Sequence, residues 1–300
     1  MNPEHMNEIK KGKKVLSESN IIVCSIVRDC GRGLKRNIPI IDSICDLSNS
    51  YQVIIFENDS VDKTKSRLEN WAKERKNISV LSESYKTQTI PSKEKNNLVN
   101  PYYSEARISK MALYRNKYLS YIKENKLEAD YVIIVDLDVF HISLNGILSS
   151  FGVNNDWDVI TANGISRSFS SKFRRRYHDA YALTECGLEN IPQTEKTINE
   201  NRYKWAFLKN GMPLIPVTSA FGGLGIYKKK AIEGCRYGVI LNADQRVECK
   251  TEHFYLYNEM KQKGYNKIFI NPSMHVKYQT QFRNTIIRFL KQFKNKSPNI

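Results

Sequence analysis

The 300-residue sequence lacks several features that define whole classes of protein. No run approaches the roughly 20 consecutive apolar residues that a membrane-spanning helix needs. The first residues are polar and rich in lysine, without the apolar core of a secretory signal. Six cysteines are scattered without the Cys-x-x-Cys spacing of a structural metal site, so we expect reduced thiols in a cytoplasmic protein. Repeats and linkers are also missing, which favours a single domain.

Acidic side chains are outnumbered by basic ones. The chain has 47 Lys and Arg against 31 Asp and Glu, a formal net charge of +16. Such an excess indicates a polyanionic neighbour, and nucleic acid, an anionic lipid surface and a diphosphate substrate all qualify. With 41% hydrophobic and 26% charged residues, the composition is otherwise that of an ordinary soluble protein with a large core.

The first half of the chain alternates predicted strands and helices. Apolar runs at residues 21–27, 51–56, 78–81 and 131–135 are typical of buried strands, and residues 104–125 carry the clearest helical pattern. This order predicts an α/β fold with a parallel sheet and right-handed crossovers.

The second half is less regular, with a long polar stretch at residues 164–212 and a glycine-rich, strand-like segment at 219–227. We expect a helix at 251–263 and short strands at 268–270 and 274–278. The predicted organisation is a flexible leader (1–19), one domain (20–280) and a basic, amphipathic C-terminal tail (281–300).

The run YVIIVDLDVF at residues 131–140 ends a predicted buried strand in two carboxylates, Asp136 and Asp138. Side chains two residues apart on an extended chain project to the same side. The two acids therefore repel each other unless a cation lies between them, and Mg²⁺ or Mn²⁺ suits such oxygen ligands. The alternative is an exposed Asp-x-Asp loop beyond a core strand.

Several motifs in this order resemble the GT-A fold glycosyltransferases, and especially the capsule-type mannosyltransferases and their bacterial relatives. The resemblance covers about residues 20–280. It rests on the turn at 57–64, Arg115-Asn116, the Asp-x-Asp motif, Trp157-Asp158, the Phe221-Gly-Gly segment and Glu252-His253. One departure is Asp59, where many members of the fold have glycine.

The resemblance implies a single GT-A domain with a Rossmann-like, mixed but mostly parallel sheet. It implies transfer of a hexose, such as mannose, from a GDP- or UDP-sugar to a hydroxyl of a glycan or lipid-linked glycan. Asp138 would bind Mn²⁺ or Mg²⁺ directly, with Asp136 holding the ribose or a metal-bound water. The residues implied to bind the nucleotide are Arg28, Asp29, Glu57 and Asp59, with Arg107, Arg115 and Asn116 near the phosphates.

Some of these residues have structural alternatives. Ser60 or Asp62 can instead cap the following helix. Arg107 and Arg115 share a helix face with Met111, which indicates that this face belongs partly to the core.

Two histidines and one glutamate near the C-terminal end are further candidates. GT-A enzymes often take a third metal ligand from a late histidine; we favour His275 over His253, and either can instead be structural. Glu252 lies where inverting members keep a general base, and in a retaining enzyme it would hold the acceptor. Alternatively, Glu252 is a helix-terminal acid favoured by the helix dipole.

Asp179, Gly222 and Gly223 are candidates for contacts with the sugar substrates. The glycines allow a ligand to approach the backbone closely, or mark a β-bulge. Asp179 suits sugar hydroxyls, or lies in a surface turn.

The tail mixes apolar and basic residues, which fits peripheral binding to the cytoplasmic face of an anionic membrane or packing on the domain. Two other functions remain open, a metal-dependent nucleotidyltransferase or nuclease, which needs a further acid, and a non-enzymatic nucleic-acid-binding protein.

Overall fold

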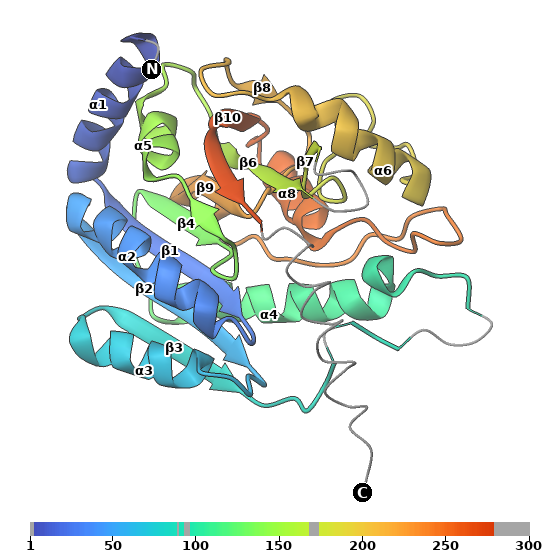
Figure 1. Ribbon diagram of the computed structural model, residues 1–300, viewed down its shortest axis with the longest axis horizontal. Helices are drawn as coiled ribbons and strands as arrows, with labels where there is room; N and C mark the ends of the chain where they lie inside the picture. The colour runs from blue at the N-terminus through green and yellow to red at the C-terminus, as the bar shows by residue number, and fades with distance from the viewer. Residues whose placement is uncertain (1–2, 89, 93–96, 168–173, 279–300) are drawn as a thin grey trace, which may run out of the picture.

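The computed structural model describes residues 3–88, 90–92, 97–167 and 174–278. The first half contains the predicted alternation of strands and helices, and the helix expected at residues 104–125 spans Glu105–Glu124 (Figure 1). Its elements are α1 (Pro3–Ser17), β1 (Asn20–Val27), α2 (Gly31–Leu47), β2 (Ser50–Asn58), α3 (Thr64–Glu74), β3 (Ile78–Glu83), the 3-10 helix η1 (Pro101–Tyr103), α4 (Glu105–Glu124) and β4 (Tyr131–Val135).

The second half adds short strands and helices around the same sheet. Its elements are β5 (His141–Ile142), α5 (Leu144–Gly152), β6 (Val159–Arg167), β7 (Arg175–Tyr177), α6 (Glu195–Lys204), the 3-10 helix η3 (Trp205–Phe207), β8 (Ile215–Pro216), β9 (Leu224–Lys228), α7 (Lys229–Ile232), α8 (Glu252–Gln262) and β10 (Ile268–Lys277).

The central sheet has ten strands, of which eight run in the order β3-β2-β1-β4-β9-β6-β10-β5. The first four are parallel to one another, whereas β9 is antiparallel to both β4 and β6. The strand β10 then pairs in parallel with β6. The expected mixed, mostly parallel sheet is therefore confirmed.

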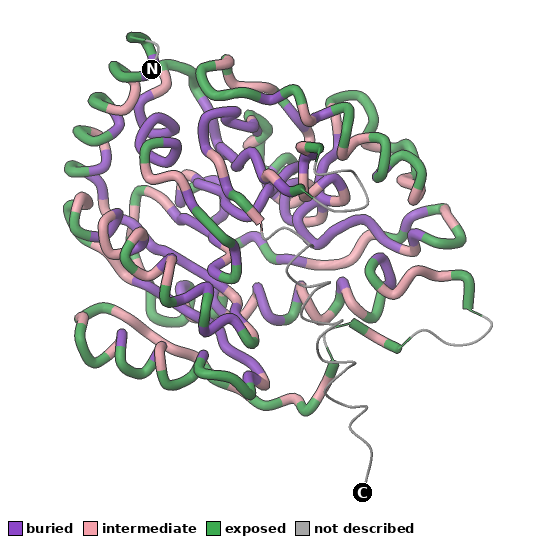
Figure 2. Tube along the Cα trace, viewed as in Figure 1, coloured by how far each residue is buried: buried purple, intermediate pink, exposed green. Residues whose placement is uncertain are grey.

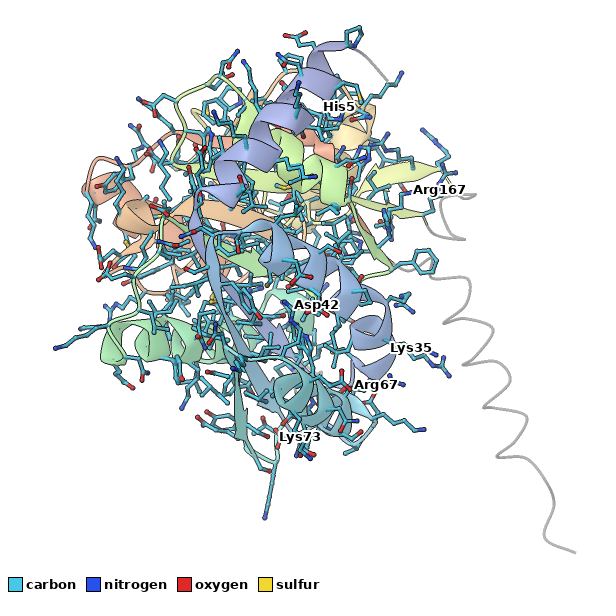
Figure 3. All side chains as sticks on the ribbon, turned by 90° about the vertical axis from the view of Figure 1, so that its left-hand side faces the viewer. His5, Lys35, Asp42, Arg67, Lys73 and Arg167 are labelled. Atoms are coloured by element: carbon cyan, nitrogen blue, oxygen red, sulfur yellow. The ribbon has the colours of Figure 1, made fainter. Side chains whose placement is uncertain are left out.

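Helices cover both faces of the sheet, which explains why its central strands are apolar throughout (Figure 2). Alternate residues of β1 enter different cores: Ile21 and Val23 face α1, α2, α3 and α5, whereas Ile22 and Cys24 face α4, α7 and α8. Figure 3 views the first of these layers from outside the sheet. There Asp42 of α2 accepts a hydrogen bond from Trp71 Nε1 of α3 at 2.9 Å.

The prediction of a flexible leader at residues 1–19 is wrong for the residues that the structure describes. Residues 3–17 form α1, which packs against α5 and buries Leu16 completely. The two helices cross where Gly12 meets Gly152: a Cβ on Gly12 would lie 1.7 Å from the carbonyl oxygen of Leu148. Because this contact uses glycine rather than an apolar stripe, the hydrophobic pattern did not indicate it.

Two further expectations are refined by the structure. The two short strands expected at 268–278 are one strand, β10, with an irregularity between Asn271 and His275. In the glycine-rich segment only β9 is a strand, because Gly222 and Gly223 have positive φ angles and form a turn before it. The predicted tail at 281–300 lies outside the described residues. None of the described helices has the length and apolar character needed to cross a bilayer.

Candidate functional site

A cavity of about 530 Å³ opens where β1 and β4 end, with α4 and the start of α8 as its other walls. The carboxyl ends of parallel strands are where ligands gather in open α/β sheets. Nine of the sequence-predicted site residues line this cavity: Arg28, Asp29, Arg107, Arg115, Asp136, Asp138, Asp179, Glu252 and His253. Six others do not line it: Glu57, Asp59, Asn116, Gly222, Gly223 and His275.

Asp136 and Asp138 reach the cavity because the residues between and after them are held on the opposite side. Leu137 and Val139 are buried, and their carbonyl oxygens each accept a hydrogen bond from Asn37 Nδ2 at 2.9 Å. The amide of Asp136 donates to the carbonyl oxygen of Gly223 at 2.8 Å, which fixes the end of β4. The two acids therefore face the cavity together.

The acidic pair is electrostatically unfavourable as it stands. Burial raises the pKa of Asp136 to about 7, with a further contribution from the charges of Asp138 and Asp179, although Arg115 opposes the shift. The pKa of Asp138 is also raised, by loss of hydration within the cavity, although the residue as a whole is exposed. Excess negative charge therefore faces the cavity at this point.

Arg115 connects two walls of the cavity. It is 4% exposed; its Nε donates to Glu252 Oε1 at 2.9 Å, and its Nη2 lies 3.7 Å from Asp136 Oδ1. Its guanidinium also lies over the rings of Phe221 and Tyr237, with 4.9 and 5.7 Å to the ring centroids. Its Nη1 is buried, and no atom of the described part of the chain forms a hydrogen bond with it. Arg115 is therefore buried against aromatic rings, as expected of a residue that belongs partly to the core, and it also lines the cavity.

Two neighbouring turns form the edge of the cavity beside Arg28 and Asp29. Asp29 has a positive φ of 49°, and its Oδ1 accepts from the amide of Val61 in the turn after β2. Asp62 accepts from the amides of Gly31 and Thr64, and so joins the starts of α2 and α3. The N-cap residue of α3 is Lys63, so Asp62 is not the cap that was expected, but its bond from the amide of Thr64 still supports the start of that helix.

Glu57 is not in the position expected for a nucleotide-binding residue. Its side chain is fully buried, with Oε1 accepting from the amide of Ser60 at 2.8 Å and Oε2 from the hydroxyl of Ser82. Both carboxylate oxygens are thus used to shape the turn. The sequence did not reveal this, because Ser82 comes from the neighbouring strand β3.

Asp59 likewise supports the turn rather than lining the cavity. Its φ is 52°, a conformation that favours glycine, which explains why glycine is common at this place in the fold. Its Oδ1 accepts from the amides of Tyr85 and Lys86. Burial opposes a low pKa, but the hydrogen bonds from Lys86, Ser84 and Asn58 outweigh it and lower the pKa of Asp59 to about 2.

Asn116, Gly222 and Gly223 also have structural partners. The side-chain amide of Asn116 exchanges two hydrogen bonds with the backbone of Tyr237, at 3.0 and 2.8 Å. A Cβ on Gly222 would lie 2.1 Å from the carbonyl oxygen of Ala162, so the close approach at this glycine is to the protein itself. Gly222 still contributes indirectly, because its amide donates to Asp179 Oδ2 at 3.1 Å.

The two candidate metal-binding histidines differ in position. His253 lines the cavity, whereas His275 lies on β10 paired with Asn163 of β6 and does not line it. The preference for His275 therefore runs against the geometry. Across the ranges that the structure describes, no three His, Cys, Asp or Glu side chains form a group that could hold a metal ion.

Several cavity residues were not singled out from the sequence. Tyr278 donates its hydroxyl to Asp136 Oδ2 at 3.3 Å, and its ring stacks on His178 with centroids 3.6 Å apart. Tyr114 stacks on Phe56 at 5.6 Å beside the end of β2. His178 directly precedes the candidate Asp179, and this position was a signal in the sequence. No such signal indicated Tyr278, because it lies 142 residues from Asp136 along the chain.

Comparison with known proteins now identifies the family. A family model described as Cryptococcal mannosyltransferase 1 matches residues 38–296, which is most of the chain. The chain belongs to this family. This membership confirms the predicted enzyme class, a glycosyltransferase of the GT-A kind. No curated protein sequence matches the chain.

Several solved structures are similar to this chain. The mannosyltransferase PcManGT from Pyrobaculum calidifontis, solved with GDP-Man and Mn²⁺, is 10% identical at a TM-score of 0.46, and the match covers 91% of this chain and 65% of that one. The glucosyl-3-phosphoglycerate synthase of M. tuberculosis is 12% identical at a TM-score of 0.44, and the match covers 90% of this chain and 75% of that one. S. aureus TarS (residues 1–349) is 13% identical at a TM-score of 0.44, and the match covers 87% of this chain and 60% of that one.

Proposed function

We propose that this protein transfers a hexose, with mannose as the first choice, from a GDP- or UDP-sugar to a hydroxyl of a glycan or lipid-linked glycan, using a divalent metal ion. The observation that carries the proposal is the cavity itself. It combines the paired acids of β4 with Arg28, Arg107 and Arg115 at the carboxyl edge of the sheet. A cavity with both acids and cations suits a metal-bound diphosphate better than a neutral ligand.

The residues present fit a divalent cation. Asp136 and Asp138 face one cavity, and their mutual repulsion contributes to the raised pKa of Asp136. A cation with oxygen ligands relieves that repulsion, and two carboxylates with water and phosphate oxygens are a usual site for Mg²⁺ or Mn²⁺. Asp138 and Asp136 would hold the ion, and neither histidine is needed as a ligand. When bound, the ion supplies charge neutralisation for the departing diphosphate.

The protein's own cations surround the place where the diphosphate would lie. Arg107 lines the cavity with its Nη1 on the carbonyl oxygen of Tyr102 at 3.0 Å, and its Nε is buried without a partner. Arg115 Nη1 is also without one. We assign both to the phosphates, where charge-assisted hydrogen bonds are strong. Arg28 and Asp29, at the end of β1, are assigned to the nucleoside.

Glu252 is assigned to the acceptor. Its carboxylate is fixed by Arg115 on the cavity wall, so it can accept a hydrogen bond from an incoming hydroxyl in a defined direction. In an inverting reaction it takes the proton of that hydroxyl; in a retaining reaction it only orients it. Asp179, held by the amide of Gly222, is assigned to sugar hydroxyls.

The test is donor hydrolysis and transfer in the presence of Mn²⁺. A panel of nucleotide sugars is first screened by thermal shift, because a ligand of the native state raises the unfolding temperature. Asp138→Ala and Asp138→Asn are then compared with the wild type, and we expect a loss on the order of 100-fold. Asp156→Asn is the control, since Asp156 is a surface acid paired with Lys228 and Lys267. Equal activity of wild type and Asp138→Ala would end the proposal.

We also propose that the protein binds anionic membranes through its basic tail. The support is the net charge of +16 and the alternation of apolar and basic residues in the sequence of 281–300. Co-sedimentation with phosphatidylcholine vesicles, with and without phosphatidylserine, tests this. A chain ending at residue 280 is the control, and equal binding of both chains would contradict the proposed role of the tail.

A further inference from the structure

Three consecutive residues at the start of α8 line the cavity, and two of them have buried polar atoms that are unpaired. Thr251, Glu252 and His253 all line the cavity, and they are 5%, 5% and 3% exposed. Glu252 has its partner in Arg115. The polar atoms on either side of it are Thr251 Oγ1 and both ring nitrogens of His253, which are buried and have no hydrogen-bond partner among the residues that the structure describes.

Three unpaired polar atoms at one place are costly. Each buried donor or acceptor without a partner has lost its hydration without compensation, and native proteins contain few of them. The nearest charged atom does not relieve His253, because Glu252 Oε1 lies 3.7 Å from His253 Nε2, beyond hydrogen-bonding distance. Thr251 makes no capping bond, although it is the N-cap of α8. Such a cluster indicates atoms kept for a ligand.

The chemistry of that ligand follows from the state of His253. Burial, reinforced by the positive charge of Arg115, lowers the pKa of His253 well below its usual value, so its imidazole is neutral. A neutral imidazole offers one donor and one acceptor. A phosphate oxygen can only accept, and a metal ion engages a single nitrogen. A hydroxyl group both donates and accepts, and neighbouring sugar hydroxyls match His253 and Thr251 together.

The ring of His253 is also held in a fixed orientation. It stacks on Phe221 with centroids 4.1 Å apart and planes at 19°, and meets the edge of Tyr237 at 5.5 Å and 84°. Packing on two sides limits rotation of the imidazole, so its nitrogens point in set directions. Fixed polar groups on an aromatic wall are typical of sites that select one ligand stereochemistry.

We infer that Thr251 and His253 form a hydroxyl-recognition site for a carbohydrate ring beside Glu252, and that His253 determines sugar specificity instead of binding the metal. The inference rests on the proposed glycosyltransferase activity. It names carbohydrate hydroxyls as the ligand, whether they belong to the donor sugar or to the acceptor. The experiment below separates these two sources.

The experiment compares sugar analogues that each lack one hydroxyl. His253→Phe keeps the aromatic packing but removes both nitrogens, and His253→Asn keeps one donor and one acceptor. His141→Phe is the matched control, because His141 lies on β5 outside the cavity lining. For the nucleotide sugar that the wild type hydrolyses fastest, kcat/KM is measured for the parent and each deoxy analogue, first without acceptor and then with deoxy acceptors. The Mn²⁺ concentration giving half-maximal rate is measured for every variant.

We expect the wild type and His141→Phe to use one deoxy analogue about tenfold less well than its parent sugar. His253→Phe should use the two equally well, at an unchanged Mn²⁺ requirement, and His253→Asn should retain part of the discrimination. An effect seen without acceptor assigns the site to the donor sugar, and an effect confined to deoxy acceptors assigns it to the acceptor.

Other results would overturn the inference. Full discrimination by a folded His253→Phe protein would show that the histidine reads no hydroxyl. A tenfold higher Mn²⁺ requirement with unchanged discrimination would make His253 a metal ligand. A wild type that hydrolyses no nucleotide sugar would refute the proposed function itself, and with it the inference, whereas the first two results leave the proposed function intact.

Discussion

Arg115 on α4 and Glu252 at the start of α8 are separated by 137 residues and form a buried ion pair, with Arg115 Nε 2.9 Å from Glu252 Oε1. The same guanidinium lies 3.7 Å from Asp136 at the end of β4. One cation therefore compensates acids from two different elements, and the cavity wall depends on it. The first prediction concerns its removal.

Arg115→Met should destabilise the fold by about 3–5 kcal/mol, because it leaves the buried carboxylate of Glu252 without a partner. Urea denaturation gives the free energy of unfolding. Lys204→Met is the control: Lys204 pairs with Glu185 while 58% exposed, so its loss should cost less than about 1 kcal/mol. The double variant Arg115→Met/Glu252→Gln should recover part of the loss. No recovery would contradict the pairing as the cause.

Gly222→Ala should be more damaging than Gly187→Ala, although both glycines have positive φ angles, of 66° and 83°. At Gly187 nothing lies within 4 Å of the new Cβ, so only the backbone strain of about 1 kcal/mol applies. At Gly222 the Cβ would also lie 2.1 Å from the carbonyl oxygen of Ala162. Thermal unfolding of the two variants measures the difference, and equal melting temperatures would contradict the clash.

His178 should make the protein sensitive to acid. Burial, with help from Arg176 and Arg202, lowers its pKa from 6.5 to about 3. Because the folded-state pKa is depressed, this contribution to stability is complete above pH 6.5 and is lost as the pH falls towards 3, by at most about 1.4 kcal/mol per pH unit. His178→Phe keeps the stacking on Tyr278 and removes the titration. Its free energy of unfolding should therefore fall less steeply below pH 6.5; identical slopes in both proteins would refute the assignment.

Mn²⁺ binding should strengthen as the pH rises through about 7, the pKa of Asp136. Below that pH the ion must displace the proton of a carboxyl whose neutral form is favoured by burial, so affinity should fall about tenfold per pH unit. Calorimetric titration with Mn²⁺ and a fixed nucleotide on both sides of neutrality measures this. Asp136→Asn should bind more weakly and lose the pH dependence, whereas Asp156→Asn should behave as the wild type.

The strands that bear the site were predictable because they are buried on both faces. The runs around β1, β2 and β4 are almost purely apolar, and an acid directly after such a run stands out. The parallel order then brings the ends of these strands to one edge. In this way Asp29, Asp136 and Asp138 were found without knowledge of any contact.

Side-chain partners from distant segments were not predictable. Glu57 and Asp59 look like exposed turn acids, but Ser82 and the backbone of Lys86 use their oxygens. Asn116 resembles a phosphate ligand because it follows Arg115. Consecutive side chains of a helix point in different directions, however, and the side chain of Asn116 contacts the backbone of Tyr237. These contacts depend on which strand lies beside which, a choice that periodicity within one element does not encode.

The position of β1 in the middle of the parallel strands limits how the protein can be shortened. The family match begins at residue 38, inside α2, and so omits both α1 and β1. Because β1 pairs with β2 on one side and β4 on the other, a chain starting there would have two separate half-sheets with unpaired edges. Expression trials should therefore keep the first 37 residues, since the family match and the folding unit begin at different residues in this protein.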